Sequence, residues 1–116
     1  MQINFFTHGK AIAAKISGEL DHHAAARIKD DIDRRIICGH KNLVLDLSDL
    51  NFMDSSGRGV ILGRYKLICG CGGEMAIIAG NNKNVKKILE MSGIPRLIKI
   101  YDSFAQLTEN KRSDVV

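Results

Sequence analysis

The chain has 116 residues, of which 45% are hydrophobic and 26% charged, and its formal net charge is +4. This length predicts one domain over residues 1–116, and the apolar content excludes a disordered chain. No apolar run approaches the roughly 20 residues that cross a membrane, and the first residues lack the apolar segment of a signal peptide. The three cysteines match no secreted disulfide framework, so a cytoplasmic location is expected.

The basic residues are scattered along the chain, which argues against a nucleic-acid-binding face. Aromatic residues make up only 5% of the chain and do not alternate with lysine or arginine to form a stacking platform for bases. A net charge of +4 allows contact with an acidic partner without requiring one. We therefore expect neither a nucleic acid nor a membrane among the direct partners.

The first segments of the chain predict a β-hairpin. Residues 11–17 alternate apolar side chains in the manner of a strand, and they should pair with residues 3–7 through a turn at His8 and Gly9. Gly18 should end this strand, because glycine interrupts strand patterns.

A helix and a buried strand follow the hairpin. Asp21 is a candidate N-cap for the helix, and Gly39 should end it. Its apolar residues recur at helical spacing, at Ala25, Ile28, Ile32 and Ile36. The run NLVLDL at residues 42–47 is typical of a strand that is buried in a sheet.

The remainder of the chain alternates helices and strands. The predicted elements are a helix over residues 60–68, a strand over 74–80, a helix over 84–93 that Gly93 closes, and a strand over 96–101. Asp102 or Ser103 should cap a short final helix, and residues 110–116 should fray. This alternation predicts an α/β fold with a largely parallel sheet.

The segment FMDSSGRGV, at residues 52–60, does not look like ordinary packing. It joins the end of a predicted strand to a helix start, an edge where open α/β sheets usually meet ligands and where a helix N-terminus favours anions. Asp54 or Ser55 could serve only as a helix N-cap. That role leaves Gly57 and Gly59 unexplained, since glycine costs about 1 kcal/mol relative to alanine inside a helix.

Small residues also form a stripe along the predicted helix. Ser56, Gly59 and Gly63 recur at i, i+3 and i+7, a spacing that allows another backbone to approach closely. That backbone could be the sheet beneath, which is at least as good an explanation for Gly63, or a second protein.

Three chemistries could use the two serines. A serine hydrolase would need a G-x-S-x-G elbow, which is absent, although His22 or His23 could supply a base. A nucleotide phosphate loop would need G-x-x-x-x-G-K-[ST], which is also absent. A serine that accepts a phosphoryl group needs an exposed hydroxyl, small neighbours and a rigid mount, and the segment offers all three.

Four segments of the chain resemble a known family. They are GELDHHAA at residues 18–25, the long run at 43–66, GGEMAI at 72–77 and MSGIPRLIKIY at 91–101. Together they are similar to the STAS-domain anti-sigma factor antagonists, and most of all to the sporulation antagonists of the anti-sigma F factor.

The resemblance implies a STAS fold, with a mostly parallel mixed sheet of about five strands and about four helices. It implies no catalysis and no cofactor. The unphosphorylated form would bind an ADP- or ATP-bound serine kinase that is also the anti-sigma factor, which frees the sigma factor. The kinase would then phosphorylate Ser55, and a serine phosphatase would reset the switch. Two alternatives stay open: a STAS module of another regulatory complex, and a small hydrolase that uses Ser55.

The resemblance also suggests which residues meet the partner. Asp21 matches a family position that meets the kinase. The other candidates lie around the acceptor, at Asp54, Ser56, Gly57, Arg58 and Gly59. Ser55 is preferred to Ser56 as acceptor, because Ser56 is expected to point at the sheet.

Arg58 departs from the family pattern, which usually has leucine there. Its guanidinium lies about one helical turn from Ser55 and could reach a phosphate on that serine. In the unmodified form we expect it to face solvent or an acidic patch on the kinase. The alternative is that Arg58 is a tolerated surface change.

No metal site is expected. His22 and His23 are adjacent and should point about 100° apart on a helix, so they are poorly placed to share one ion. Two pairs of possible zinc ligands follow predicted helices, at Cys38, His40, Cys69 and Cys71. The C-x-C spacing of the second pair is poorer than the usual two-residue gap.

Overall fold

The computed structural model describes the backbone of residues 1–114 and the side chains of residues 1–110. The strands are β1 (Gln2–His8), β2 (Ala11–Leu20), β3 (Leu43–Asp46), β4 (Leu50–Met53), β5 (Met75–Ile78) and β6 (Lys99–Tyr101). The helices are α1 (His22–Ile37), α2 (Ser55–Gly70), α3 (Lys83–Ser92) and α4 (Phe104–Asp114), with a 3₁₀ turn η1 (Ile94–Arg96). This is the α/β architecture that the sequence predicts, and within the described residues no helix is both long and apolar enough to span a membrane.

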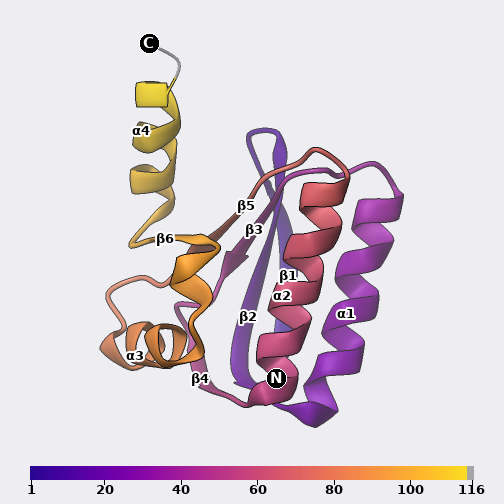
Figure 1. Ribbon diagram of the computed structural model, residues 1–116, viewed down its shortest axis with the longest axis vertical. Coiled ribbons are helices and arrows are strands. Elements are labelled where there is room, and N and C mark those ends of the chain that lie inside the picture. The colour runs from indigo at the N-terminus through magenta and orange to yellow at the C-terminus, as the bar shows by residue number, and fades with distance from the viewer. Residues whose placement is uncertain (115–116) are drawn as a thin grey trace.

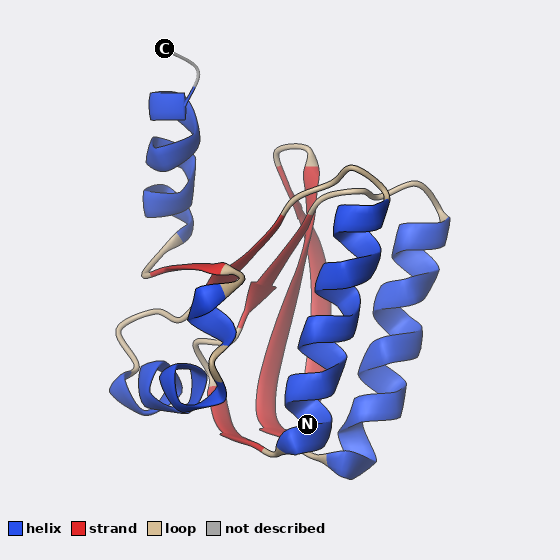
Figure 2. Ribbon diagram, in the orientation of Figure 1, coloured by secondary structure: helices blue, strands red, loops and turns tan. Residues whose placement is uncertain are grey.

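The strands form one mixed sheet in the order β1-β2-β3-β5-β6 (Figures 1 and 2). The hairpin of β1 and β2 is antiparallel and turns at Gly9, as expected, and the other pairings are parallel. The strand β4 pairs with the far end of β2 and lies off this path.

Gly18 does not end β2, which corrects the sequence-based expectation. The backbone there has a φ of +90°, a conformation that glycine adopts readily, and the pairing register shifts between Gly18 and Glu19. Before the bulge β2 pairs with β3, and after it β2 pairs with β4. The strand therefore continues to Leu20 and delivers Asp21 beside the end of β4.

Alternate residues of the strands face two separate cores. On one face, Ile12, Ala14 and Ile16 of β2 pack with buried residues of α1, α2 and α3. On the other face, Ala11 and Ala13 pack with Leu107 of α4. Figure 1 shows α1 and α2 side by side over the first face and α4 at the other end of the molecule.

One helix boundary and two strands differ from the sequence-based prediction. The strand β4 was not expected, because it has only four residues and two of them are exposed. The helix α2 begins at Ser55 rather than near residue 60, since Asp54 caps it through the glycine-rich turn. Residues 94–96 form a 3₁₀ turn that contains the proline, so β6 is shorter than predicted.

The end of the chain is helical further than expected. The Ser103 hydroxyl accepts a hydrogen bond from the Gln106 N–H at 3.1 Å, which confirms one of the two predicted caps. The helix α4 then runs to Asp114, within the segment that was expected to fray. Residues 115–116 of that segment lie outside the described part of the chain.

Candidate functional site

The N-termini of α1 and α2 meet at one edge of the sheet, and Asp54 joins them. Its Oδ1 accepts hydrogen bonds from the N–H groups of Ser56 and Gly57, at 2.9 and 3.1 Å. Its Oδ2 accepts the N–H of His22, the first residue of α1, at 3.1 Å. One carboxylate therefore satisfies backbone donors of two helices that would otherwise be unpaired. Asp21, in contrast, contacts only one of the two helices: its Oδ1 accepts a hydrogen bond from the Ala24 N–H of α1 at 3.0 Å.

Replacing Asp54 with alanine should therefore cost more stability than replacing Asp21. We expect a loss of about 2 kcal/mol for Asp54→Ala and about 1 kcal/mol for Asp21→Ala, because a lost N-cap costs roughly 0.5 to 2 kcal/mol per helix. Urea unfolding of the two variants measures this difference. Equal losses would show that the bond to His22 contributes nothing.

Gly57 holds the start of α2 against the sheet. It is buried, and a Cβ at this position would overlap the carbonyl oxygen of Leu20 and lie 2.7 Å from Cγ of Met53. The N–H of Asp54 donates to that same carbonyl at 3.4 Å. Close contact with β2 and β4 thus requires a residue without a side chain.

Gly59 gives a matched comparison two residues later. It is exposed, and a Cβ there would meet nothing within 4 Å. We expect Gly57→Ala to lose about 2 kcal/mol through overpacking and Gly59→Ala to gain up to about 1 kcal/mol from helix propensity. Thermal unfolding of both variants tests this, and a stable Gly57→Ala would mean that the helix can shift away from Leu20.

Ser55 and Ser56 differ in surroundings. Ser55 is the first residue of α2, is exposed, and its hydroxyl has no hydrogen bond to any described residue. Ser56 is half-buried, and its Oγ lies 3.4 Å from Nδ1 of His22. The expectation that Ser56 points at the sheet is therefore wrong: it faces α1, and the residue on the sheet is Gly57.

Arg58 is attached to the end of α3. Its Nε donates a hydrogen bond of 2.7 Å to the carbonyl oxygen of Ser92, the last residue of that helix. The side chain borders a groove of about 290 Å³ between α2 and α3. The groove is lined by Met53, Asp54, Ser55, Arg58, Ile88, Met91 and Ser92. Arg58 is thus exposed but tethered to α3 by this hydrogen bond, and Ser55 lines the same groove.

Of the two explanations for the stripe of small residues, contact with the sheet does not hold for Gly59 and Gly63. A Cβ on Gly59 or Gly63 would find open space, whereas only Gly57 meets the strands among the early glycines of α2. The sheet therefore does not explain Gly59 or Gly63.

Comparison with known proteins places this chain in a family. A STAS-domain model matches residues 2–107. An anti-sigma F factor antagonist from Paenibacillus polymyxa is 45% identical over 106 residues, which cover 89% of this chain and 88% of that protein. The chain belongs to the STAS-domain family of anti-sigma factor antagonists. An anti-sigma F factor antagonist from Lysinibacillus sphaericus is 33% identical over 73% of each chain.

Solved structures agree with the STAS assignment. A Thermotoga maritima protein assigned to the anti-sigma factor antagonists has a TM-score of 0.85 and 26% identity, over 95% of this chain and 94% of that one. The unphosphorylated form of the anti-sigma factor antagonist SpoIIAA has a TM-score of 0.72 and 22% identity, over 97% of this chain and 98% of that one. The latter likeness shows the shared fold. The named antagonists are regulators rather than enzymes.

The site of this STAS domain lacks the arrangement of a serine hydrolase. Asp54 binds the backbone N–H of His22 and not its ring, so it does not orient the imidazole. That ring lies beside Ser56, and no described histidine is hydrogen-bonded to Ser55. The rings of His22 and His23 pack edge-on against each other, with 5.9 Å between the ring centroids.

The possible zinc ligands do not come together in this domain. Cys38, Cys69 and Cys71 are exposed free thiols. Among the residues that the structure describes, no three histidine, cysteine or acidic side chains are grouped closely enough to hold a metal ion.

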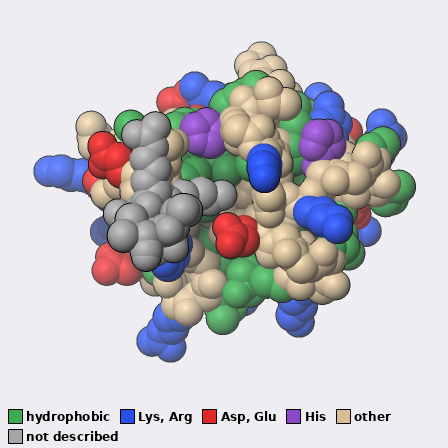
Figure 3. All heavy atoms as spheres, turned by 90° about the horizontal axis from the view of Figure 1, so that it is seen from above, with side chains coloured by type: hydrophobic (Ala, Val, Ile, Leu, Met, Phe, Trp, Pro, Cys, Tyr) green, Lys and Arg blue, Asp and Glu red, His purple; other side chains and the backbone are tan. Residues whose placement is uncertain are grey.

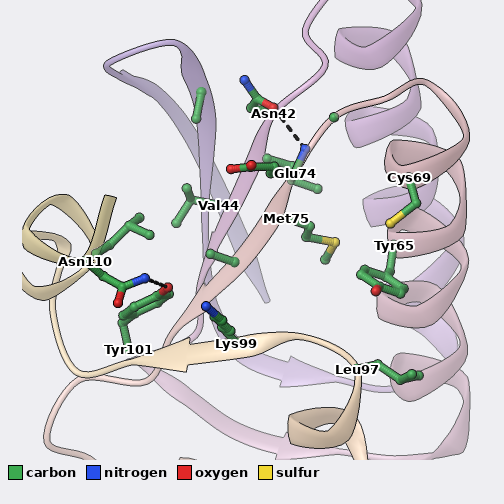
Figure 4. Close-up of a pocket in the computed structure, with 15 residues that line it drawn as sticks. Asn42, Val44, Tyr65, Cys69, Glu74, Met75, Leu97, Lys99, Tyr101 and Asn110 are labelled. Atoms are coloured by element: carbon green, nitrogen blue, oxygen red, sulfur yellow. Dashed lines mark hydrogen bonds between the residues drawn. The ribbon is translucent and has the colours of Figure 1, made fainter. Parts of the chain in front are cut away.

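A second hollow, of about 300 Å³, lies at the opposite edge of the sheet between α2, β6 and α4 (Figure 4). Tyr65 and Cys69 border it from α2, and a hydrogen bond with the Cys69 side chain raises the pKa of Tyr65 above its usual value. On the other side, the Asn110 amide donates to the Tyr101 hydroxyl at 2.9 Å. Figure 3 shows the molecule from above, where lysine and arginine side chains are scattered over the visible face and its rim rather than gathered into one patch.

Proposed function

We propose that this domain is an anti-sigma factor antagonist switched by phosphorylation of Ser55. The unphosphorylated form binds an ADP- or ATP-bound serine kinase that is also the anti-sigma factor, and this binding releases the sigma factor. The proposal is carried by the exposed Ser55 hydroxyl at the first position of α2, beside the rigid cap of Asp54. The family membership of the chain supports it.

The role of this chain in the transfer is to present a nucleophile. Oγ of Ser55 attacks the γ-phosphorus of ATP on the kinase, a new O–P bond forms, and the bond to the β–γ bridging oxygen breaks. ADP leaves with the electron pair of that bond, and a base of the kinase takes the hydroxyl proton. Position matters most in such a reaction, because phosphoryl transfer depends mainly on alignment and electrostatic stabilisation. On this side, the cap bonds of Asp54 fix the backbone at the start of α2, which carries Ser55.

The partner-binding residues divide into two groups in this proposal. Arg58 and Gly59 are exposed beside Ser55 and contact the kinase. The other predicted residues are at least half-buried and hold the surface in shape; they are Asp21, Asp54, Ser56 and Gly57. Two exposed apolar side chains extend this surface: Phe52 of β4, which is 47% exposed, and Met91 of the groove lining, which is 80% exposed.

A serine phosphatase completes the cycle in this proposal by hydrolysing phosphoserine 55. Both partners act in the cytoplasm, and neither a nucleic acid nor a membrane takes part directly. The domain itself contributes no catalysis and needs no cofactor.

Site-resolved mass spectrometry tests the acceptor. The wild-type protein, Ser55→Ala and Ser56→Ala are each incubated with an anti-sigma factor kinase from the same genome and ATP. We expect phosphate on Ser55 of the wild type and of Ser56→Ala, and none on Ser55→Ala. The Ser55→Ala variant should still bind the ADP-loaded kinase, because it retains the cap and the groove. Phosphate found mainly on Ser56 would overturn the assignment, and absence of kinase binding by all three proteins would point to another regulatory complex.

A further inference from the structure

The groove beside Ser55 is lined by a positively charged side chain, Arg58, that a hydrogen bond already holds in position. Arg58 lines this groove together with Ser55, and its Nε is bound to the Ser92 carbonyl at 2.7 Å. The other guanidinium N–H groups of Arg58 make no hydrogen bond or ion pair with the described residues. A guanidinium that is fixed at one nitrogen loses less conformational freedom when its remaining donors bind an anion.

The chain geometry brings the two residues together. Ser55 and Arg58 are three positions apart in α2, so their side chains emerge on neighbouring turns of the same helix surface. Asp54 is the acidic residue in the groove lining, and three backbone N–H groups are bound to its carboxylate. These donors offset its repulsion of a second anion, and the partial positive charge of the helix N-terminus acts in the same direction.

We propose that this groove is the receptor for the phosphate of phosphoserine 55, with Arg58 binding the dianion through its Nη nitrogens while its Nε stays on Ser92. The inference rests on the proposed function, since it concerns the phosphorylated state of the same serine. It assigns to Arg58 the role of stabilising that state. Through the Arg58–Ser92 bond, this arrangement links a phosphate at the start of α2 to the end of α3, where Met91 is 80% exposed.

The receptor can be tested without the kinase. Phosphoserine is installed at position 55 by semisynthesis, and the phosphorus NMR signal is titrated with acid and base at low salt. A nearby cation favours the dianion, so Arg58→Leu should raise the midpoint of the second phosphate ionisation by about half a pH unit, the size expected for a partly exposed ion pair. The increase should shrink in high salt.

Matched variants separate charge from tethering. Arg58→Gln removes the charge but keeps a side-chain N–H that can reach Ser92, and it should raise the midpoint as Arg58→Leu does. Arg58→Lys keeps the charge but lacks the planar guanidinium, so its midpoint should lie between those of the wild type and the neutral variants. Lys66→Leu removes an equal charge from α2, about two turns beyond Arg58, and should leave the midpoint near that of the wild type.

Overlaid titration curves for the wild type and both neutral variants would overturn the inference. Amide spectra recorded on the same samples show whether each variant is folded, and Arg58→Gln serves if Arg58→Leu is not. Because phosphoserine is installed chemically, a failure of the kinase to modify Ser55 would contradict the proposed function and leave this result intact. A normal kinase reaction with overlaid curves would contradict the receptor alone.

Discussion

Phosphorylation of Ser55 should lower the affinity of this domain for the anti-sigma factor kinase at least a hundredfold while leaving its fold unchanged. In the proposed complex, the phosphate adds a charge of about −1.5 to −2 at the position that the kinase must approach most closely. A kinase surface shaped for a hydroxyl would have to desolvate or repel this group. A loss of about 3 kcal/mol in binding free energy corresponds to more than a hundredfold in the dissociation constant.

The fold should tolerate the phosphate because of where Ser55 lies. The side chain is exposed, and the cap of α2 is made by Asp54 and not by Ser55. A helix N-terminus also favours a negative group, by roughly 0.3 to 1 kcal/mol at an exposed site. The free energy of unfolding should therefore change little or rise slightly.

Calorimetric binding and amide spectra of both forms decide this prediction. Ser55→Ala is the control for the loss of the hydroxyl and should bind the ADP-loaded kinase like the unmodified protein, whereas Ser55→Asp should bind poorly. Spectral changes confined to the starts of α1 and α2 and the end of α3 are expected. Changes spread over the sheet, or an affinity loss below tenfold, would contradict a local switch.

Features set by neighbouring residues could be predicted from the sequence. Asp21 before α1, Gly93 after α3 and the Gly9 hairpin turn were all expected from local chemistry, and each is where the sequence placed it. The candidate site was found the same way, because a carboxylate, two serines and two glycines at a strand–helix junction have few ordinary explanations. Family resemblance then narrowed the chemistry that residue spacing had left open.

Features that depend on distant parts of the chain could not be predicted. Gly18 looked like a strand end because its pairing with β4 depends on a strand that the pattern did not show. Which of Ser56 and Gly57 faces the sheet depends on the first residue of α2, since each residue turns a helix by about 100°. Arg58 lies 34 positions from Ser92, so its tether to α3 has no signal in local sequence.

Arg64 was also missed, and its burial leads to the second large prediction. It lies on the face of α2 that packs against α1, and it is only 8% exposed. Its Nε is 3.1 Å from Oδ1 of Asp33 on α1. Although the distance is that of an ion pair, the angles are poor, and within the described residues Arg64 Nε, Arg64 Nη1 and Asp33 Oδ1 have no well-formed hydrogen bond. The guanidinium therefore depends on the charge of Asp33.

Replacing Asp33 with alanine should lower the free energy of unfolding by about 3 kcal/mol, because it leaves a buried cation without its counter-charge. Asp31→Ala is the matched control. Its carboxylate is on the same helix with the same 24% exposure, but its partner Arg27 is 62% exposed and lies 3.7 Å away. An exposed partner stays hydrated, so Asp31→Ala should cost less than about 1 kcal/mol.

The burial of Arg64 also predicts rescue by a second change. Adding Arg64→Met to Asp33→Ala removes the unpaired cation and fills the same space with an apolar chain, so the double variant should recover most of the lost stability. Urea unfolding of the two single variants and the double variant measures the coupling. A double variant that is no more stable than Asp33→Ala would show that packing of the Arg64 methylenes, and not the charge of Asp33, holds α1 against α2.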